Sequence, residues 1–88
     1  MLVWRNNVGV DVTRGVRYGL AVGSADLIGV GPGGRFFGLE VKRPGQKPEP
    51  HQLGWATCVR TMGGVVEVVS SAEQALEVVQ RMRADRVR

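Results

Sequence analysis

Two short apolar runs on either side of a glycine-rich turn constrain the fold of this chain more than any other feature. The first run covers residues 27–30 and the second covers residues 36–41, with the sequence Gly-Pro-Gly-Gly at 31–34 between them. Proline presets its own φ and glycine accepts positive φ, so this segment has the chemistry of a tight turn. The stretch 23–42 is therefore predicted to form a β-hairpin.

The length of the turn decides which residues face each other across the hairpin. A four-residue turn places Asp26 opposite Leu39, and a turn one residue longer places it opposite Glu40. Opposed residues on neighbouring strands have Cβ atoms about 5 Å apart. Glu40 and Lys42 are two positions apart and leave their strand on the same face. Two carboxylates and one ammonium group are thus expected at one end of the hairpin.

This group of charged side chains can be interpreted as a metal site or as a surface salt bridge. Two carboxylates at short range repel each other unless a cation lies between them. Mg²⁺ binds through one or two carboxylates, keeps several waters and leaves room for a phosphate. A lysine beside it can orient the attacking water or stabilise the growing phosphate charge. Asp26 with Glu40 and Lys42 is thus a minimal set for metal-assisted phosphodiester hydrolysis, and the alternative is a surface salt bridge.

Length and charge favour one small domain with a polyanionic partner. The chain has 88 residues, a net charge of +4 and a pI of about 10.2, and all but two of its twelve basic residues are arginine. The guanidinium group binds phosphate through a planar fork of donors. We therefore expect a single domain over residues 1–88, with a basic tail at 83–88 and nucleic acid as partner. Plain solubility is the alternative explanation of the charge.

The sequence gives no sign of a membrane or an oxidising compartment. No run of 18 apolar residues occurs, and the N-terminal residues lack the layout of a signal peptide. The single cysteine, Cys58, cannot form an internal disulfide. A cytoplasmic location, in a bacterial or phage-infected host cell, and no membrane partner are therefore expected.

The remaining segments predict an α/β fold. We expect a strand at 2–6, a mobile basic loop at 11–24 with a short strand near 18–21, and a helix at 50–62. These are followed by a strand at 65–69, which we expect to be covered on both faces, and by a second helix that ends near residue 83. Ser70 and Glu73 have the spacing of a capping box for that helix. The strand–helix–strand crossover should make 65–69 parallel to the strand of Glu40, giving a mixed sheet of about four strands flanked by two helices.

An ordered set of short motifs resembles one nuclease family. The motifs are Arg5-Asn6-Asn7 with Gly9, Gly23-Ser24-Ala25-Asp26, Glu40-Val41-Lys42, Gln52 with Trp55, and Gly63-Gly64. Over roughly residues 2–69 this order resembles the virus-type replication–repair nuclease (VRR-NUC) domain of the PD-(D/E)xK nuclease superfamily. Ala25 replaces the usual proline. The family also usually begins with a helix carrying an acidic residue, which here is either missing or part of a longer protein.

The resemblance implies a fold, an activity and a set of roles. The fold would have a restriction-endonuclease-like core. The activity would be that of a Mg²⁺- or Mn²⁺-dependent endodeoxyribonuclease acting on branched DNA, such as a Holliday junction or a flap, in replication, recombination or repair. Asp26, Glu40 and the backbone carbonyl of Val41 would bind the metal. Lys42 would position the attacking water or stabilise the developing charge, and Gln52 would support the site.

DNA contacts and a dimer complete the expectations. The residues expected to contact DNA flank the site in sequence and are Arg5, Asn6, Arg14, Arg17, Arg43 and Lys47. A homodimer is expected because so short a chain buries little surface alone and carries several large aromatic side chains. The N-terminal strand or the first helix would form the contact. Two rivals remain: a catalytically inactive DNA-binding module of the same fold, and a structural domain whose acidic motif is only a salt bridge.

Overall fold

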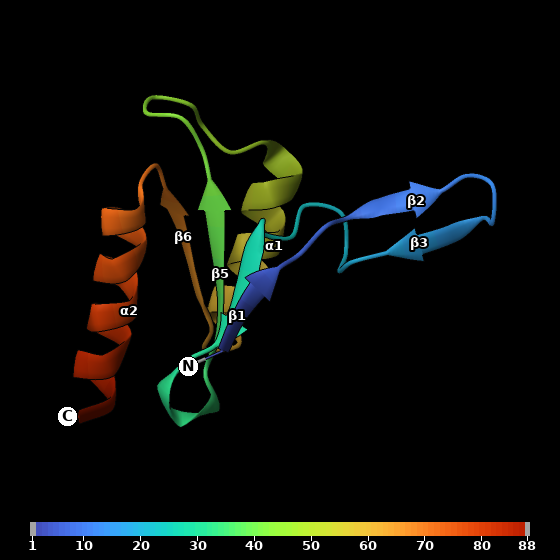
Figure 1. Cartoon of the computed structure of the whole chain (residues 1–88). Helices are drawn as coiled ribbons and strands as arrows, with labels where there is room; N and C mark the ends of the chain where they lie inside the picture. The colour runs from blue at the N-terminus through green and yellow to red at the C-terminus, as the bar shows by residue number, and fades with distance from the viewer. Residues whose placement is uncertain (1, 88) are drawn as a thin grey trace.

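The hairpin around the glycine-rich turn forms the centre of the sheet in the computed structural model (Figure 1). The model describes residues 2–87, with the backbone alone at 16–18, 86 and 87. The elements in chain order are β1 (Leu2–Arg5), β2 (Gly9–Asp11), β3 (Val16–Tyr18), β4 (Leu27–Val30), a 3-10 turn (Pro32–Gly34), β5 (Phe36–Val41), α1 (Pro50–Thr61), β6 (Val65–Val69) and α2 (Ala72–Val87).

Four of the strands form a mixed sheet in the order β1-β4-β5-β6. β4 is antiparallel to both β1 and β5, and β6 is parallel to β5. Leu27 pairs with Leu39 and Val30 pairs with Phe36, which is the register of the longer turn. The predicted mixed four-stranded α/β sheet with two helices is therefore confirmed, including the parallel crossover from β5 to β6.

The two faces of the sheet are covered by different helices. α2 covers one face, where Val78 and Met82 pack against Phe37, Leu39 and Val69 in the hydrophobic core. α1 covers the other face, where the absence of a side chain at Gly38 matters. A Cβ atom at that position would lie 3.0 Å from the ring of Trp55.

The aromatic contact continues along the same face. The rings of Trp55 and Phe36 meet edge to face with their centroids 6.1 Å apart. α1 thereby lies close against β5, and this close approach brings the first turn of α1 beside the end of β5.

The segment predicted as a mobile loop is instead mostly a two-stranded arm. β2 and β3 pair antiparallel and form a sheet of their own, which projects away from the main sheet (Figure 1). The short strand lies at 16–18 rather than at 18–21. Strands of three residues are too short to show a clear two-residue period, which is why the sequence pattern did not reveal them.

The second helix differs from its prediction at both ends. The N–H of Gln74 donates to Ser71 Oγ at 3.2 Å, and the N–H of Ser70 donates to the side chain of Gln74 at 2.6 Å. The capping arrangement is therefore one residue later than the predicted Ser70 and Glu73. α2 also continues to Val87, because residues 72–87 contain neither glycine nor proline.

The burial of β6 also differs from its prediction. Val66 and Val69 are buried, but Val68 is 42% exposed, so the predicted cover on both faces is incomplete. Neither helix is long and apolar enough, within the described residues, to cross a membrane.

Candidate functional site

Asp26 and Glu40 meet at the end of the hairpin because of the strand register. Leu27 and Leu39 are the last pair of the β4–β5 ladder, so the next residues, Asp26 and Glu40, lie opposite each other just beyond it. Their side chains share the face that α1 covers. The carboxyl groups are close enough for a hydrogen bond between them. The predicted meeting of the two acids is thus confirmed, in the register of the longer turn that places Asp26 opposite Glu40.

Glu40 is almost fully buried, with 5% of its surface exposed. Burial is the main cause that raises its pKa from 4.5 to about 7, followed by the negative charge of Asp26 and the hydrogen bond shared with it. The positive charge of Lys42 acts in the opposite direction and is the smallest of these effects. At neutral pH, Glu40 therefore exchanges readily between its neutral and ionised forms.

Gln52 holds Glu40 from the first turn of α1. Pro50 occupies the first helical position, where its missing N–H has no helical partner to lose. The side-chain oxygen of Gln52 accepts the N–H of Glu49 at 2.7 Å, as in a capping box. Its side-chain nitrogen is thereby turned toward the sheet and donates to Glu40 Oε1 at 3.0 Å. Helix capping and orientation of the buried acid are performed by one side chain.

Asp26 is exposed to solvent, and one of its oxygens is fixed by the backbone. The N–H of Val41 donates to Asp26 Oδ2 at 2.9 Å, at a point where β4 has ended and offers β5 no main-chain acceptor. The N–H and C=O groups of one residue point to the same side of a strand. The carbonyl of Val41 therefore also faces the side on which Asp26 lies.

Asn6 holds the segment that leads into Asp26. It is 8% exposed, and its side-chain nitrogen donates to Ser24 Oγ at 2.7 Å and to the carbonyl of Ala25 at 2.9 Å. Its side-chain oxygen accepts the N–H of Leu20 at 3.1 Å. Its own N–H donates to the carbonyl of Asp26 at 2.8 Å. Asn6 was predicted to contact DNA, and the structure instead places its amide in contacts within the protein.

A close backbone approach joins this segment to α1. Gly23 has φ of +92°, and a Cβ atom there would lie 2.5 Å from the carbonyl oxygen of His51. Only glycine fits such a contact without strain. The chain therefore passes directly over the start of α1 before it reaches Asp26, which brings Asp26 and Gln52 to the same end of the sheet.

The comparisons with known proteins add no relative. The chain matches no protein-family model, and no curated protein or solved structure shows significant similarity to it. The family resemblance of the ordered motifs therefore stays a prediction.

The donor set at this end of the sheet suits a small hard cation. Within residues 2–87, no three His, Cys, Asp or Glu side chains gather in one group. Mg²⁺ needs fewer, because one or two carboxylates suffice when water and phosphate complete the shell. Asp26, Glu40 and the carbonyl of Val41 supply oxygen ligands only. These residues fit Mg²⁺ or Mn²⁺, and the exposure of Asp26 leaves the remaining positions open to solvent.

The residues expected to bind DNA are divided between two places. Arg5 lines an open cleft together with Asp26 and Val41, and the exposed Arg43 and Lys47 lie in the segment between β5 and α1. Arg14 is elsewhere, at the turn of the arm. The side chain of Arg17 lies outside the described part of the chain. The structure thus places Arg5 beside Asp26, Arg43 and Lys47 in the segment that follows the strand of Glu40, and Arg14 apart from them.

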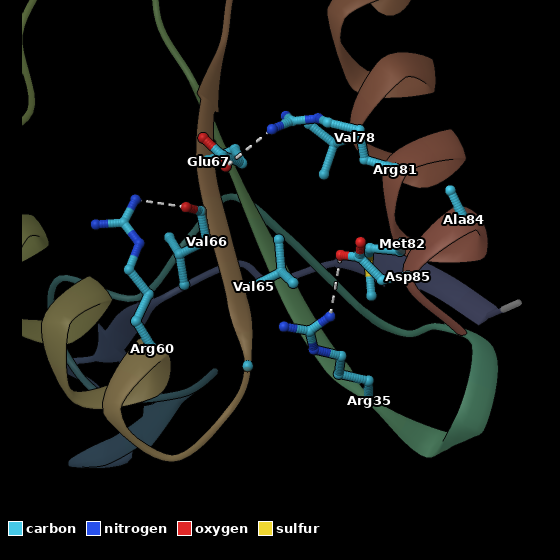
Figure 2. Close-up of a pocket in the computed structure, with 11 residues that line it drawn as sticks. Arg35, Arg60, Val65, Val66, Glu67, Val78, Arg81, Met82, Ala84 and Asp85 are labelled. Carbon is cyan, nitrogen blue, oxygen red and sulfur yellow. Dashed lines mark hydrogen bonds and ion pairs between the residues drawn. The ribbon is translucent and has the colours of Figure 1, made fainter. Parts of the chain in front are cut away.

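A second basic surface was missed by the sequence analysis. A groove beside β6 is lined by Arg35, Arg60 and Arg81, which are far apart in the sequence (Figure 2). Arg35 and Arg81 form exposed ion pairs of 3.7 Å with Asp85 and Glu67. Arg60 donates to the carbonyl of Val66. Each arginine has a partner within the protein, so we assign the groove a structural role.

Proposed function

We propose that this chain is a Mg²⁺- or Mn²⁺-dependent DNA endonuclease that hydrolyses phosphodiester bonds. The observation that carries the proposal is the pair formed by Asp26 and the buried Glu40. Burying a carboxylate beside another is unfavourable for folding, because burial and like charge both oppose ionisation. Such a pair is favoured where a cation neutralises it, and perturbed acids of this kind mark functional sites.

Each side chain of the site has a defined task under this proposal. Asp26, Glu40 and the Val41 carbonyl would hold the metal, which when bound neutralises phosphate charge and makes water more acidic. Gln52 fixes the rotamer of Glu40 by its 3.0 Å hydrogen bond. Lys42 lies close enough to act on the charge of Glu40. Its ammonium group would donate to the scissile phosphate as negative charge develops there.

The proposed substrate is branched DNA, such as a Holliday junction or a flap. The arginine-rich composition supports a phosphate-led interface. The choice of branched DNA comes from the resemblance of the ordered motifs to the VRR-NUC domain. The chain contains no zinc-finger spacing, so nothing in it argues for reading a base sequence. A restriction-endonuclease-like core belongs to the same proposal.

The decisive experiment is cleavage of labelled single-stranded, duplex, flap and four-way DNA, with and without Mn²⁺. The wild type should cut at least one branched substrate only when the metal is present. Glu40→Gln should abolish cleavage while DNA binding is kept or tightened, because the change removes negative charge. Glu67→Gln removes the same charge at an exposed ion pair outside the site and should cut normally. Full activity of Glu40→Gln would contradict the assignment.

Lys42→Ala separates chemistry from binding. Loss of one donor to the transition state lowers the rate by about 10²-fold or more, and single-turnover kinetics measure that step directly. Lys47→Ala is the matched control, since Lys47 is exposed and should affect affinity more than rate. If Lys42→Ala weakens binding and leaves the single-turnover rate intact, Lys42 is only a phosphate contact.

The alternative is a catalytically inactive DNA-binding module of the same fold. The observation that favours it is that the described residues bring only two acidic side chains together at the site. This alternative predicts salt-dependent DNA binding with no product at any metal concentration. A third possibility, a structural domain, predicts neither DNA binding nor a rise in melting temperature with Mn²⁺.

A further inference from the structure

An open cleft leads from the proposed metal site to the base of the β2–β3 arm. Its lining residues are Arg5, Asn6, Asn7, Asp26, Leu27 and Val41. The cleft thus runs from Asp26 to Asn7, which lies two residues before β2. The segment that returns from the arm is held at the same place, because Asn6 Oδ1 accepts the N–H of Leu20 at 3.1 Å and a Cβ atom at Gly19 would clash with the carbonyl of Asn7. The arm therefore starts and ends at the cleft.

The arm is long enough to follow a duplex away from the cut position. It projects from the main sheet (Figure 1), and the radius of gyration is 13.8 Å against about 12 Å for a compact chain of this length. Val12, at the turn, comes five residues after Asn7. A strand rises about 3.4 Å per residue, so the tip lies about 17 Å from the base of the arm. Since one base pair occupies about 3.4 Å of the duplex axis, the arm reaches up to about five base pairs along DNA in the cleft.

A ribbon of two strands has the shape that the major groove of DNA accepts. That groove is about 12 Å wide and admits an α-helix or a two-stranded β-ribbon, whereas the minor groove is about 6 Å wide. β2 and β3 form a sheet of two strands with three residues each. Val10 is 51% exposed and Val12 is 89% exposed. These side chains can contact base edges, but they carry no hydrogen-bonding group that would read a base sequence.

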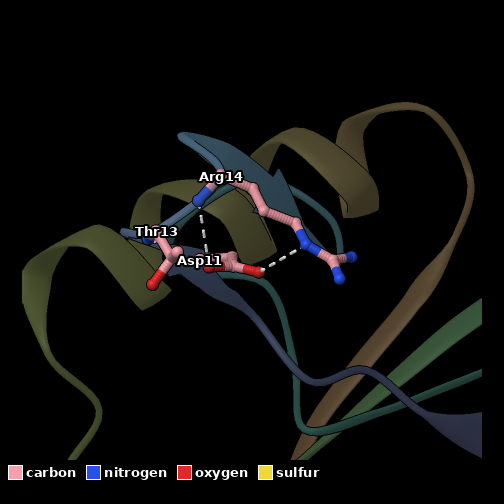
Figure 3. Close-up of polar contacts among 3 residues, drawn as sticks. All are labelled: Asp11, Thr13 and Arg14. Atoms are coloured by element: carbon pink, nitrogen blue, oxygen red, sulfur yellow. Dashed lines mark hydrogen bonds and ion pairs between the residues drawn. The ribbon is translucent and has the colours of Figure 1, made fainter.

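The turn of the arm presents an arginine (Figure 3). Asp11 Oδ1 accepts the N–H groups of Thr13 at 3.0 Å and Arg14 at 3.2 Å. The N–H of Gly15 donates to the carbonyl of Asp11 at 2.7 Å. The side chain of Arg14 is 81% exposed, and its Nε lies 3.8 Å from Asp11 Oδ2, an exposed pair that constrains the arginine little. Residues 9–18 contain one further arginine, Arg17, and no further acid, so the arm has a net positive charge.

The place of Arg14 in the fold distinguishes it from the arginines of the groove beside β6. Arg14 and Arg81 are both exposed and form ion pairs of similar length, 3.8 and 3.7 Å. Arg81 lies on α2, on the face of the sheet opposite to α1. The arm is instead joined to the cleft that contains Asp26. DNA that reaches Asp26 through this cleft passes the arm, and Arg81 is therefore the matched comparison for Arg14.

We propose that the β2–β3 arm binds in the major groove of the duplex beside the cut position, with Arg14 on a phosphate and Val12 against the base edges. The inference deepens the proposed function and rests on it, since the cleft must hold DNA. It specifies what the arm recognises, which is double-stranded DNA within about five base pairs of the scissile phosphate, without a preferred sequence. The contact itself needs no metal.

Two substitutions in the turn should change DNA binding in opposite directions. Arg14→Ala should reduce the magnitude of the slope of log affinity against log salt by about 0.9 for each protomer bound, because one phosphate contact is lost. Asp11→Asn keeps the oxygen that accepts the turn N–H groups but removes a negative charge, so the affinity should rise about two- to fivefold. Fluorescence anisotropy with four-way DNA, without divalent metal, measures both effects. A turn with only a structural role predicts no rise for Asp11→Asn.

The ion pair of Glu67 and Arg81 provides the matched controls. Arg81→Ala and Glu67→Gln break a pair of similar length outside the cleft and should leave the slope and the affinity unchanged. If Arg14→Ala keeps the wild-type slope, or Asp11→Asn binds no tighter than the wild type, the arm proposal is overturned and the nuclease proposal stands. A wild type that shows both turn effects but cuts no DNA with Mn²⁺ overturns only the nuclease proposal. A wild type that binds no DNA overturns both.

Photo-cross-linking locates the tip of the arm on the DNA. In a Cys58→Ser background, an aryl azide is attached to Val12→Cys or, at the base of the arm, to Asn7→Cys. On a four-way junction, adducts from position 12 should lie up to about five nucleotides further along one duplex arm than adducts from position 7. Glu73→Cys is the control and should give few adducts, because Glu73 is exposed on α2. Adducts from position 12 that are no more frequent than those from position 73, or that fall on the same nucleotides as those from position 7, would overturn the proposal.

Discussion

At the scale of single residues, Glu40 makes the stability of the metal-free protein depend on pH. Its pKa is about 7 in the folded chain, against 4.5 for the ordinary side chain. Between these values the folded state binds more protons than the unfolded state, so the free energy of unfolding falls as pH rises. The loss should reach at most about 3 kcal/mol between pH 4.5 and 8. Urea unfolding in EDTA at several pH values measures it.

Two variants show whether Glu40 causes this dependence. Glu40→Gln cannot ionise and should flatten the curve between pH 4.5 and 7. Glu67→Gln, which changes a half-exposed acid outside the site, should leave the curve unchanged. A wild-type protein that becomes more stable as pH rises through this range would show that Glu40 is ionised and well compensated in the folded state.

Asn6 is the second residue whose effect can be measured, because its side chain positions Asp26. Asn6→Ala removes three hydrogen bonds from a nearly buried amide, each contributing about 1 kcal/mol to stability. We expect the variant to lose about 2–3 kcal/mol of unfolding free energy. It should also need about tenfold more Mn²⁺ for half-maximal stabilisation, as for other residues that orient metal ligands. Thermal melts across a Mn²⁺ titration test both effects.

Asn7→Ala is the matched control for this substitution. Asn7 is the exposed neighbour of Asn6, so its replacement should change neither the melting temperature nor the response to Mn²⁺. If Asn6→Ala instead weakens DNA binding with an unchanged melting temperature, then Asn6 contacts DNA and does not position Asp26.

At the scale of secondary-structure elements, the prediction was correct where glycine or proline marks a turn or the start of a helix. The turn at 31–34 predicted the β4–β5 hairpin, and Pro50 marked the first residue of α1. The arm was missed because its two strands have three residues each. The end of α2 was placed too early because the basic tail contains no helix breaker to mark the boundary.

In the site, too, contacts within one hairpin could be predicted from the sequence, and contacts between distant segments could not. The hairpin register brought Asp26 and Glu40 together, and that pairing could be read from the sequence. The role of Asn6 could not, because its side-chain partners lie 14 to 19 residues away and no sequence period records such contacts. The arginines of the groove beside β6 come from a turn, α1 and α2, and only the folded chain brings them together.

At the scale of the whole molecule, the basic side chains that follow β5 and the basic side chains that form ion pairs lie in different parts of the surface. Arg43 and Lys47 are exposed between β5 and α1, at the end of the sheet that carries the carboxylates. The ion pairs among the described residues involve Arg14, Arg35 and Arg81 instead. Phosphate contacts near the site should therefore be made by side chains that need not leave an internal partner first.

The salt dependence of DNA binding measures these contacts and also counts the copies that make them. For duplex arms, the slope of log affinity against log salt is about −0.9 for each phosphate contacted. Arg43→Ala should reduce its magnitude by about 0.9 if one copy binds, and by about 1.8 if both protomers of a dimer bind. Arg81→Ala, in the groove beside β6, should leave the slope unchanged. Fluorescence anisotropy without divalent metal, between 50 and 200 mM salt, gives the slopes. If Arg43→Ala and Lys47→Ala both keep the wild-type slope, the segment between β5 and α1 does not contact the phosphates, and the interface must be sought on the arm.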